Sequence, residues 1–334
     1  MRVRRAFADT PQGQVHFRYA GAGIPVVLMH WAPASSREHV SVMELLSERA
    51  FQGIAPDLLG YGDSDKPQAQ CSIADYARNL GELLDVLGLD GVCLYGGHTT
   101  AAVAAEFSAT TAVRVRRLAL DGSPVLDAAD RAARAGKYTP PLELHADGSH
   151  MQQAWKRAYR NPAMSLEEVF ADCVDFLKAG ATYHTGYEAV WAYDMAPRLP
   201  QLTMPTLAIT TPDDPLADAH RCVLAAVPDC REFVGAPRYS QTVAERDAQM
   251  AAVLGEFFSS GGQLPHHAQS MTVAAQTRRE TVAHSGPLVA GTAAPGTSLQ
   301  NMARARFRNA CATVDWCAIV VGAGTIGSPL GDVA

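Results

Sequence analysis

The sequence predicts an α/β protein in which a mostly parallel sheet is flanked by helices. From residue 24 onward, short and continuously apolar runs alternate with segments of helical periodicity. Strands that are apolar on both faces are typical of parallel sheets covered by helices on each side. A second observation is the turn Gly96-Gly97-His98-Thr99-Thr100-Ala101, which joins an apolar run to an alanine-rich, helix-prone segment. A strand that passes through such a glycine turn into a helix pushes one side chain out over the edge of the sheet, and here that side chain is His98.

The elements of the sheet domain follow one another in a regular order. Buried strands are expected at 24–29, 53–57, 92–95, 115–120 and 206–209. Helices are expected at 40–50, 72–87 and 101–109. Ser72 is a suitable N-cap for the second helix, because apolar residues recur after it at helical spacing. This alternation assigns the core of the fold to residues 1–126 and 203–258.

The stretch 127–202 interrupts this alternation and contains only helical patterns. Helices are expected there at 151–159, 165–177 and 185–193. An all-helical insertion between two strands is what a cap over an active site would look like. We therefore assign residues 127–202 as a helical cap.

Composition excludes several classes of function. Hydrophobic residues make up 48% of the 334 residues and charged residues 19%, which is ample for a packed core. The net charge of −6 includes no basic block, so we expect no nucleic-acid partner. No run of 18 apolar residues and no secretory pattern occurs, which predicts no membrane association and a cytoplasmic location. The seven cysteines are scattered without C-x-x-C pairing, which favours reduced thiols and predicts no metal site.

The C-terminal part has a different character. Residues 259–315 are poor in large apolar side chains and are expected to form a flexible linker or tail. In 316–334, an apolar run leads into Gly322, Gly324 and Gly327, a G-x-G-x-x-G pattern that resembles the opening of a flavin- or nicotinamide-binding Rossmann unit. Only seven residues follow Gly327, too few to hold a dinucleotide, so we expect no functional cofactor. A truncated fusion to an FAD-dependent oxidoreductase and a chance apolar tail are the two interpretations.

Four local patterns occur in the order and spacing of one known superfamily. They are Met29-His30-Trp31, the loop Pro56–Pro67, the turn Gly96–Ala101, and Thr210-Thr211-Pro212-Asp213-Asp214-Pro215. Together they resemble the α/β-hydrolase fold superfamily over residues 10–258. The resemblance is closest to the epoxide-hydrolase, dehalogenase and lyase-like members that carry a helical cap.

The chain departs from that family at the residues that do its chemistry. The family places a serine, cysteine or aspartate at the turn, a histidine that takes the proton after the last strand, and an acid that orients this histidine. The resemblance implies Asp214 as the acid. The turn carries His98 instead, and no histidine occurs between His220 and His266. Two of the three roles therefore lack their usual residue.

His98 has two interpretations. A neutral imidazole can remove a proton or attack an electrophile, and Asp214 or Asp121 could orient it as a His–Asp dyad. Alternatively, His98 fills the space of an inactive triad. We favour the first interpretation, because an exposed polar residue at a strained turn has few structural reasons to be there.

The resemblance also implies the surroundings of the site. The oxyanion loop would include His30, Trp31 and Ala32, and the backbone N–H of Thr99 would complete the oxyanion hole. Polar and aromatic residues of the cap and of the last loop are candidates for the substrate pocket: Trp155, His150, Tyr187, Trp191 and Tyr239.

Two functions follow from these residues. The first is an enzyme that acts on a small apolar substrate, with polyketide-like compounds among the candidates. It hydrolyses an ester, lactone or epoxide or catalyses a proton transfer with a His–Asp dyad. The alternative is a catalytically silent binding or accessory domain, fused to or neighbouring a flavoprotein oxidoreductase. A small molecule is the expected partner in both cases.

Overall fold

The computed structural model describes residues 2–111, 114–136 and 141–259. The predicted linker from residue 260 onward lies outside the described residues. The Rossmann-like fragment with Gly322, Gly324 and Gly327 lies outside them as well.

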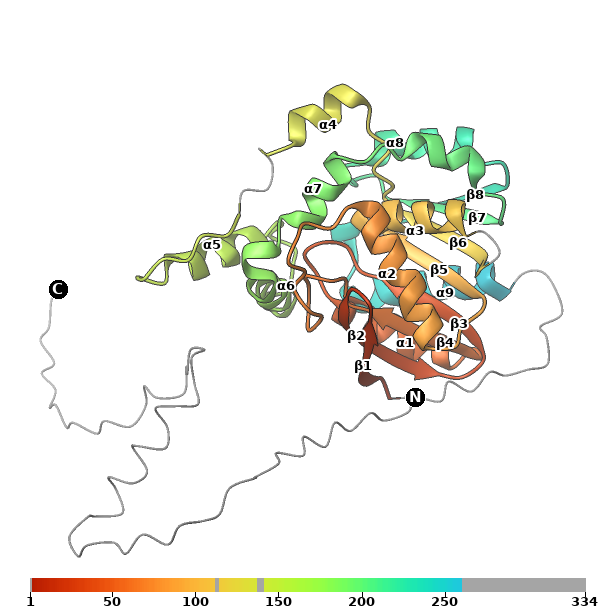
Figure 1. Ribbon diagram of the computed structural model, residues 1–334, viewed down its shortest axis with the longest axis horizontal. Coiled ribbons are helices and arrows are strands. Elements are labelled where there is room, and N and C mark those ends of the chain that lie inside the picture. Colours follow the sequence, from red (N-terminus) through yellow and green to blue (C-terminus); the bar gives the residue numbers. More distant parts are fainter. Residues whose placement is uncertain (1, 112–113, 137–140, 260–334) are drawn as a thin grey trace, which may run out of the picture. The chain divides into compact units, whose positions relative to one another are not determined.

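An eight-stranded sheet forms the centre of the described part, with strand order β1-β2-β4-β3-β5-β6-β7-β8 (Figure 1). Its strands are β1 (Arg4–Thr10), β2 (Gly13–Gly21), β3 (Ile24–Met29), β4 (Phe51–Pro56), β5 (Val92–Gly97), β6 (Val115–Asp121), β7 (Thr206–Thr210) and β8 (Cys230–Val234). The first three strands in this order pair antiparallel, and every other neighbouring pair is parallel. The predicted fold class, an α/β protein with a mostly parallel sheet, is confirmed.

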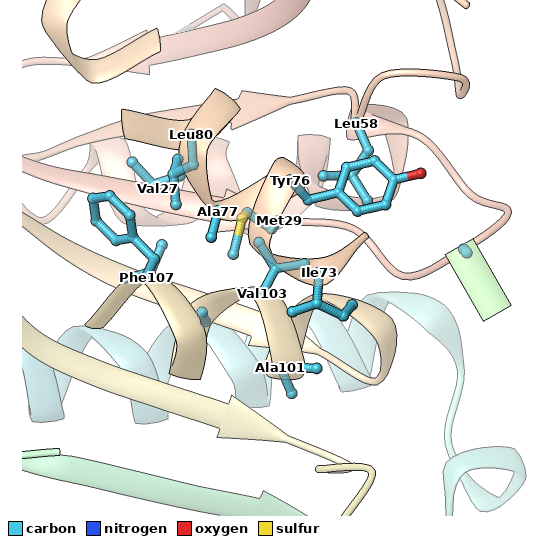
Figure 2. Packing of buried hydrophobic residues seen from close by; sticks show 14 of the residues in the cluster. Val27, Met29, Leu58, Ile73, Tyr76, Ala77, Leu80, Ala101, Val103 and Phe107 are labelled. Carbon is cyan, nitrogen blue, oxygen red and sulfur yellow. The ribbon is translucent and has the colours of Figure 1, made fainter. Parts of the chain in front are cut away.

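Alternate residues of the central strands feed two apolar clusters, one on each face of the sheet. On β3, Val27 and Met29 join the cluster under α2 (Ile73–Val86) and α3 (Thr99–Thr110). Figure 2 shows these two side chains packed among residues of both helices. Val26 and Leu28 join the second cluster, on the opposite face.

The helices that cover the sheet begin where the sequence allows. Ser72 and Asp75 form a capping box at the start of α2. The second face is covered by α1 (Val40–Ser47) and α9 (Val243–Ser259), which contact each other. Helix α9 was not expected, and it carries the folded core one residue beyond the predicted boundary at 258. Helix α8 (Ala217–Ala226) lies between β7 and β8.

Between β6 and β7 the structure contains helices and no strand within the described residues. They are α4 (Ala128–Arg134), α5 (Ser149–Ala158), α6 (Leu166–Ala179), η3 (Gly180–Thr182), α7 (Thr185–Trp191) and η4 (Ala196–Gln201). The three helices predicted there all form, with bounds shifted by a few residues. Tyr61 ties them to the core, because its hydroxyl donates to the carbonyl oxygen of Tyr183 and accepts from the N–H of Gly186. The role of residues 127–202 as a cap over the site stays a prediction.

Two further short helices border the site described below. Helix η1 (Ser36–His39) follows β3, and η5 (Arg238–Ser240) follows β8. Among the described helices, none has both the length and the apolar character needed to cross a bilayer.

Candidate active site

His98 stands at the apex of the turn between β5 and α3. Its backbone has φ 48° and ψ −109°, a conformation that residues with a Cβ rarely adopt. Gly96 makes the turn possible, because a Cβ there would lie 2.2 Å from the carbonyl oxygen of Thr100. The hydroxyl of Thr100 accepts from the N–H of Gly97 at 2.9 Å and lies 3.0 Å from the carbonyl oxygen of Met29, to which it can donate. The turn is therefore fixed at its base while His98 stays strained at its tip.

The imidazole of His98 is paired with the carboxylate of Asp214. Nε2 of His98 lies 3.1 Å from Oδ2 of Asp214, and the other carboxylate oxygen accepts from the N–H of Leu216 at 2.7 Å. Burial by itself opposes ionisation of Asp214, but these hydrogen bonds and the positive charge of Arg238 hold its pKa below the usual range. A carboxylate accepts only, so Nε2 of His98 carries the hydrogen, and Nδ1 of the neutral ring is left as an acceptor. The side chain of His98 is 31% exposed, so solvent or a ligand can reach it.

Asp121, the other predicted partner, does not pair with the imidazole. It lies at the end of β6, where its carbonyl oxygen accepts from the N–H of His98 at 2.8 Å. Its carboxyl group accepts from the hydroxyl of Tyr95 at 2.8 Å. Burial raises the pKa of Asp121. Of the two carboxylates that the sequence offered, the structure pairs Asp214 with the ring, whereas Asp121 holds the backbone of the turn.

His30 is placed as a brace of the loop after β3. Its Nε2 accepts from the N–H of Leu58 at 3.0 Å, so its Nδ1 carries the hydrogen and donates to the carbonyl oxygen of Trp31 at 2.8 Å. Burial lowers the pKa of His30, which favours this neutral state. Both ring nitrogens are thereby occupied, and His30 is fully buried. It supports the loop rather than facing a substrate.

The other residues of the predicted oxyanion loop lie close to the turn. The indole ring of Trp31 stands edge-on to the His98 ring, with centroids 5.7 Å apart. Ala32 is buried beside it in the chain. Thr99 is the first residue of α3, where backbone N–H groups have no acceptor within the helix. The oxyanion hole itself stays a prediction.

One cavity borders the turn, and a second cavity shares part of its wall. The first is small, about 60 Å³, and is lined by His98 itself, together with Asp121, Phe233 and Arg238. The second, larger one of about 320 Å³ is lined by Trp31, Glu38, Tyr95, Arg238 and Tyr239, and by residues of α6. Arg238 is common to both cavities. Tyr239 lines the larger cavity, and its place in a substrate pocket stays a prediction.

The predicted cap residues differ in whether they line a cavity. Tyr187 borders a third cavity of about 160 Å³, together with Trp31 and Phe176. Trp191 packs against Tyr187 and under the guanidinium of Arg134.

Neither Trp155 nor His150 lines any of these three cavities, and their place in a substrate pocket stays a prediction. They lie on α5, whose buried face is formed by Ala154 and Ala158. Successive residues of a helix point about 100° apart. Trp155 is consequently 37% exposed, and His150 accepts a hydrogen bond from the backbone N–H of the exposed residue His145.

One group of potential metal ligands exists within the described residues: His16, Asp57 and Asp63. The carboxylate of Asp57, the central residue of this group, is already engaged by neighbouring groups. The carboxylate of Asp57 accepts from the N–H groups of Ser36 and Asp63 and lies 2.7 Å from Nδ1 of His16. These contacts give Asp57 a structural role at the end of β4. The expectation of no metal or cofactor stays a prediction.

Sequence reasoning missed three residues of the site. Gly122 follows β6 and leaves room for the His98–Asp214 pair. Arg238 stands in the segment where the resemblance required a histidine. The absence of that histidine from the sequence could have pointed to this segment. Glu38 lies in η1 and lines the larger cavity. No pattern in the sequence distinguishes Glu38 from an ordinary surface glutamate.

The sheet order and the strained turn between β5 and α3 define an α/β-hydrolase-type protein. A family profile described as "alpha/beta hydrolase fold" matches residues 24–243, well over half of the chain. The chain therefore belongs to the α/β-hydrolase fold family.

Curated relatives carry more specific names. A protein named haloalkane dehalogenase 2 from Mycobacterium tuberculosis is 33% identical over 143 residues, which cover 40% of this chain and 48% of the relative. A soluble epoxide hydrolase from Corynebacterium sp. (strain C12) is 36% identical over 132 residues, which cover 39% and 44% respectively. The matched segments thus span less than half the length of these relatives.

Solved structures agree on the fold. The structure of Cfl2 from Burkholderia cenocepacia superimposes with a TM-score of 0.63 at 23% identity, covering 77% of this chain and 96% of that protein. At such identity the likeness concerns the fold alone.

Proposed function

We propose that this protein is a hydrolase in which His98, oriented by Asp214, acts as the general base that activates water. The substrate class is a small, mostly apolar ester, lactone or epoxide. One observation carries this proposal: the 3.1 Å contact between Nε2 of His98 and Oδ2 of Asp214, at the apex where this fold displays its reactive residue. A proton transfer between substrate atoms would use the same pair.

The chemistry needs a single base that can also return the proton. Nδ1 of His98 accepts a proton from water while the water oxygen bonds to the electrophilic carbon. The carboxylate of Asp214 stabilises the resulting imidazolium, as the acid does in a Ser–His–Asp triad. The imidazolium then donates the proton to the departing oxygen, which restores neutral His98. For an epoxide this oxygen is that of the opening ring, and for an ester or lactone it is that of the alcohol.

Activated water is favoured over a covalent hydroxyl route by the residues around the turn. Neither Thr99 nor Thr100 offers an exposed hydroxyl, because both side chains are buried. The hydroxyl of Thr100 is engaged by the backbone of the turn. The nearest serines in the loop after β3 are buried as well: Ser35 donates to the carboxylate of Asp175, and Ser36 is inaccessible.

The names of two curated relatives, a haloalkane dehalogenase and a soluble epoxide hydrolase, support a reaction at a carbon centre of a small molecule. Against the silent alternative stands the strain at His98. A positive φ costs about 1–3 kcal/mol for a residue with a side chain, and such strain is typical of functional positions.

The test is turnover of a panel of p-nitrophenyl esters, lactones and epoxides by the wild type and three variants. His98→Ala should abolish turnover, and Asp214→Asn should lower it less severely, by about 10⁴-fold. His145→Ala, at an exposed histidine, is the matched control and should keep wild-type rates. Thermal unfolding measured by circular dichroism checks that each variant is folded. Wild-type rates in His98→Ala would disprove the assignment, and no turnover of any compound by the wild type would favour the silent alternative.

A further inference from the structure

Arg238 occupies the segment after β8 where the family resemblance required a histidine. Its guanidinium carbon lies 4.3 Å from the ring centroid of Trp31, a cation–π distance. The backbone of Arg238 is fixed at both polar groups: its N–H donates to the carboxylate of Asp213 at 2.9 Å, and its carbonyl oxygen accepts from Arg246 at 3.4 Å. The charged group is therefore held in a defined position on the wall shared by the larger cavity and the small cavity at the turn.

The larger cavity contains three other arginines, and each of them is neutralised. Arg37 pairs with Asp175 at 2.8 Å, and Arg160 pairs with Asp172 at 2.7 Å. Arg246 pairs with Glu168 at 3.1 Å. Within the described part of the chain, no carboxylate oxygen lies within ion-pair distance of Arg238. Of the four, Arg238 is the one without a carboxylate in direct ion-pair contact, and its charge acts only at longer range on Asp247, which lines the same cavity, and on Asp214.

Glu38 lines the same cavity and does not neutralise Arg238. Its Oε2 atom is inaccessible to solvent and has no hydrogen-bond partner among the described residues. Burial raises the pKa of Glu38 to about 8, although the charge of Arg238 opposes this rise. At pH 7 the carboxyl group is therefore mostly neutral. A neutral carboxyl group can donate a hydrogen bond into the cavity and does not repel a bound anion.

We propose that the larger cavity binds a small molecule with a carboxylate group, which pairs with Arg238 while an apolar body rests against Trp31 and Tyr95. Planar guanidinium groups bind carboxylates through two parallel hydrogen bonds, and aromatic contact positions the guanidinium for this geometry. The cavity volume of about 320 Å³ lies at the lower end of the range for small-molecule pockets, about 300–1,000 Å³.

This inference rests on the proposed function insofar as it makes the carboxylate part of the substrate. Arg238 lines the cavity of His98 as well, so an anion bound to Arg238 would bring the rest of the molecule next to the base. The substrate would then be an ester, lactone or epoxide that carries a free carboxylate.

Binding can be measured without turnover, with benzoate as the probe and benzamide as its uncharged counterpart. Isothermal titration calorimetry of the wild type should show benzoate binding about ten-fold or more tightly than benzamide, since hydrogen bonds to charged groups contribute about 1.5–3 kcal/mol. Arg238→Met, which keeps an apolar chain on Trp31, should abolish this preference. Glu38→Gln, which keeps an uncharged donor, should retain it.

Arg117→Met is the matched control, because Arg117 also lies over an aromatic ring, 5.3 Å from the centroid of Phe257, and lines neither cavity. This variant should bind benzoate as the wild type does. Equal affinity for benzoate and benzamide in the wild type, or an unchanged preference in Arg238→Met, would overturn the inference.

The failure of this inference can be told apart from the failure of the proposed function. His98→Ala should retain benzoate binding even though it abolishes turnover. Benzoate binding to a protein that hydrolyses neither the panel nor esters, lactones and epoxides that carry a free carboxylate would refute the hydrolase alone. Turnover of uncharged esters by a wild type that does not prefer benzoate would refute the carboxylate site alone.

Discussion

The Cα of Gly122 lies so close to the His98 ring that a Cβ at position 122 would stand 2.7 Å from Nε2 of His98. The same Cβ would stand 2.9 Å from Oδ2 of Asp214, so it would press on both members of the pair. The backbone of Gly122 cannot retreat freely, because its N–H donates to the carbonyl oxygen of Ile209 on β7 at 3.1 Å. The absence of a side chain after β6 is therefore a geometric requirement of the His98–Asp214 contact.

Gly122→Ala should consequently separate the pair and lower turnover by about a hundred-fold, since misplacement of a catalytic group by about 1 Å can have that effect. Gly122 also has φ +57°, so alanine adds a backbone cost of about 1 kcal/mol. Gly88→Ala is the matched control: Gly88 has φ +66°, but nothing lies within 4 Å of its Cβ position. Gly88→Ala should lose only this backbone cost in urea unfolding and keep its activity, while Gly122→Ala should lose at least as much stability and lose its activity as well. Full activity in Gly122→Ala would argue against the dyad.

The strained backbone at His98 lowers the stability of the protein, while the imidazole at that position serves the proposed activity. His98→Gly and His98→Ala both remove the imidazole, so the loss of the contact with Asp214 cancels between them. Glycine adopts the observed φ of 48° without strain, whereas alanine keeps the cost. His98→Gly should therefore exceed His98→Ala in free energy of unfolding by about 1 kcal/mol, measured in urea, and both should be inactive. Equal stability would mean that the turn relaxes once the imidazole is gone.

The sequence was sufficient to predict the fold, because its apolar runs and helical periods are local signals. The run 92–95 followed by Gly96 and Gly97 could be read directly as a strand and a tight turn, and the structure forms both. The acid was predicted as one of two residues. Asp214 and Asp121 both follow central strands, and only the three-dimensional direction of their side chains separates them.

Longer-range features of the site could not be predicted. Trp155 has the residue type of a pocket wall, but the buried face of α5 is set by which side of the helix meets α6. Glu38 and Arg238 are far apart in the chain and meet only because the loops after β3 and β8 border one cavity. Whether a charged side chain is neutralised depends on residues that are distant in the chain, and a single sequence does not identify those residues.

The buried carboxyl group of Glu38 predicts a specific dependence of stability on pH. Its pKa is raised from the ordinary value of 4.5 to about 8, with burial as the main cause. The folded state therefore holds a proton that the unfolded state releases in this window. The contribution of Glu38 to stability is fully present below pH 4.5 and is lost as the pH rises through 8.

Glu38→Gln carries a neutral side chain at every pH and removes this loss. The variant and the wild type should have similar free energies of unfolding near pH 4.5, and the variant should be more stable by about 4 kcal/mol at pH 8.5, because each unit of pKa difference corresponds to about 1.4 kcal/mol. Glu44→Gln, at an exposed position on α1, is the matched control and should follow the wild type at each pH. The measurement is urea unfolding followed by tryptophan fluorescence across this range. A difference between Glu38→Gln and the wild type that stays constant with pH would show that Glu38 is ionised throughout, and the cavity would then hold no spare positive charge for an anion.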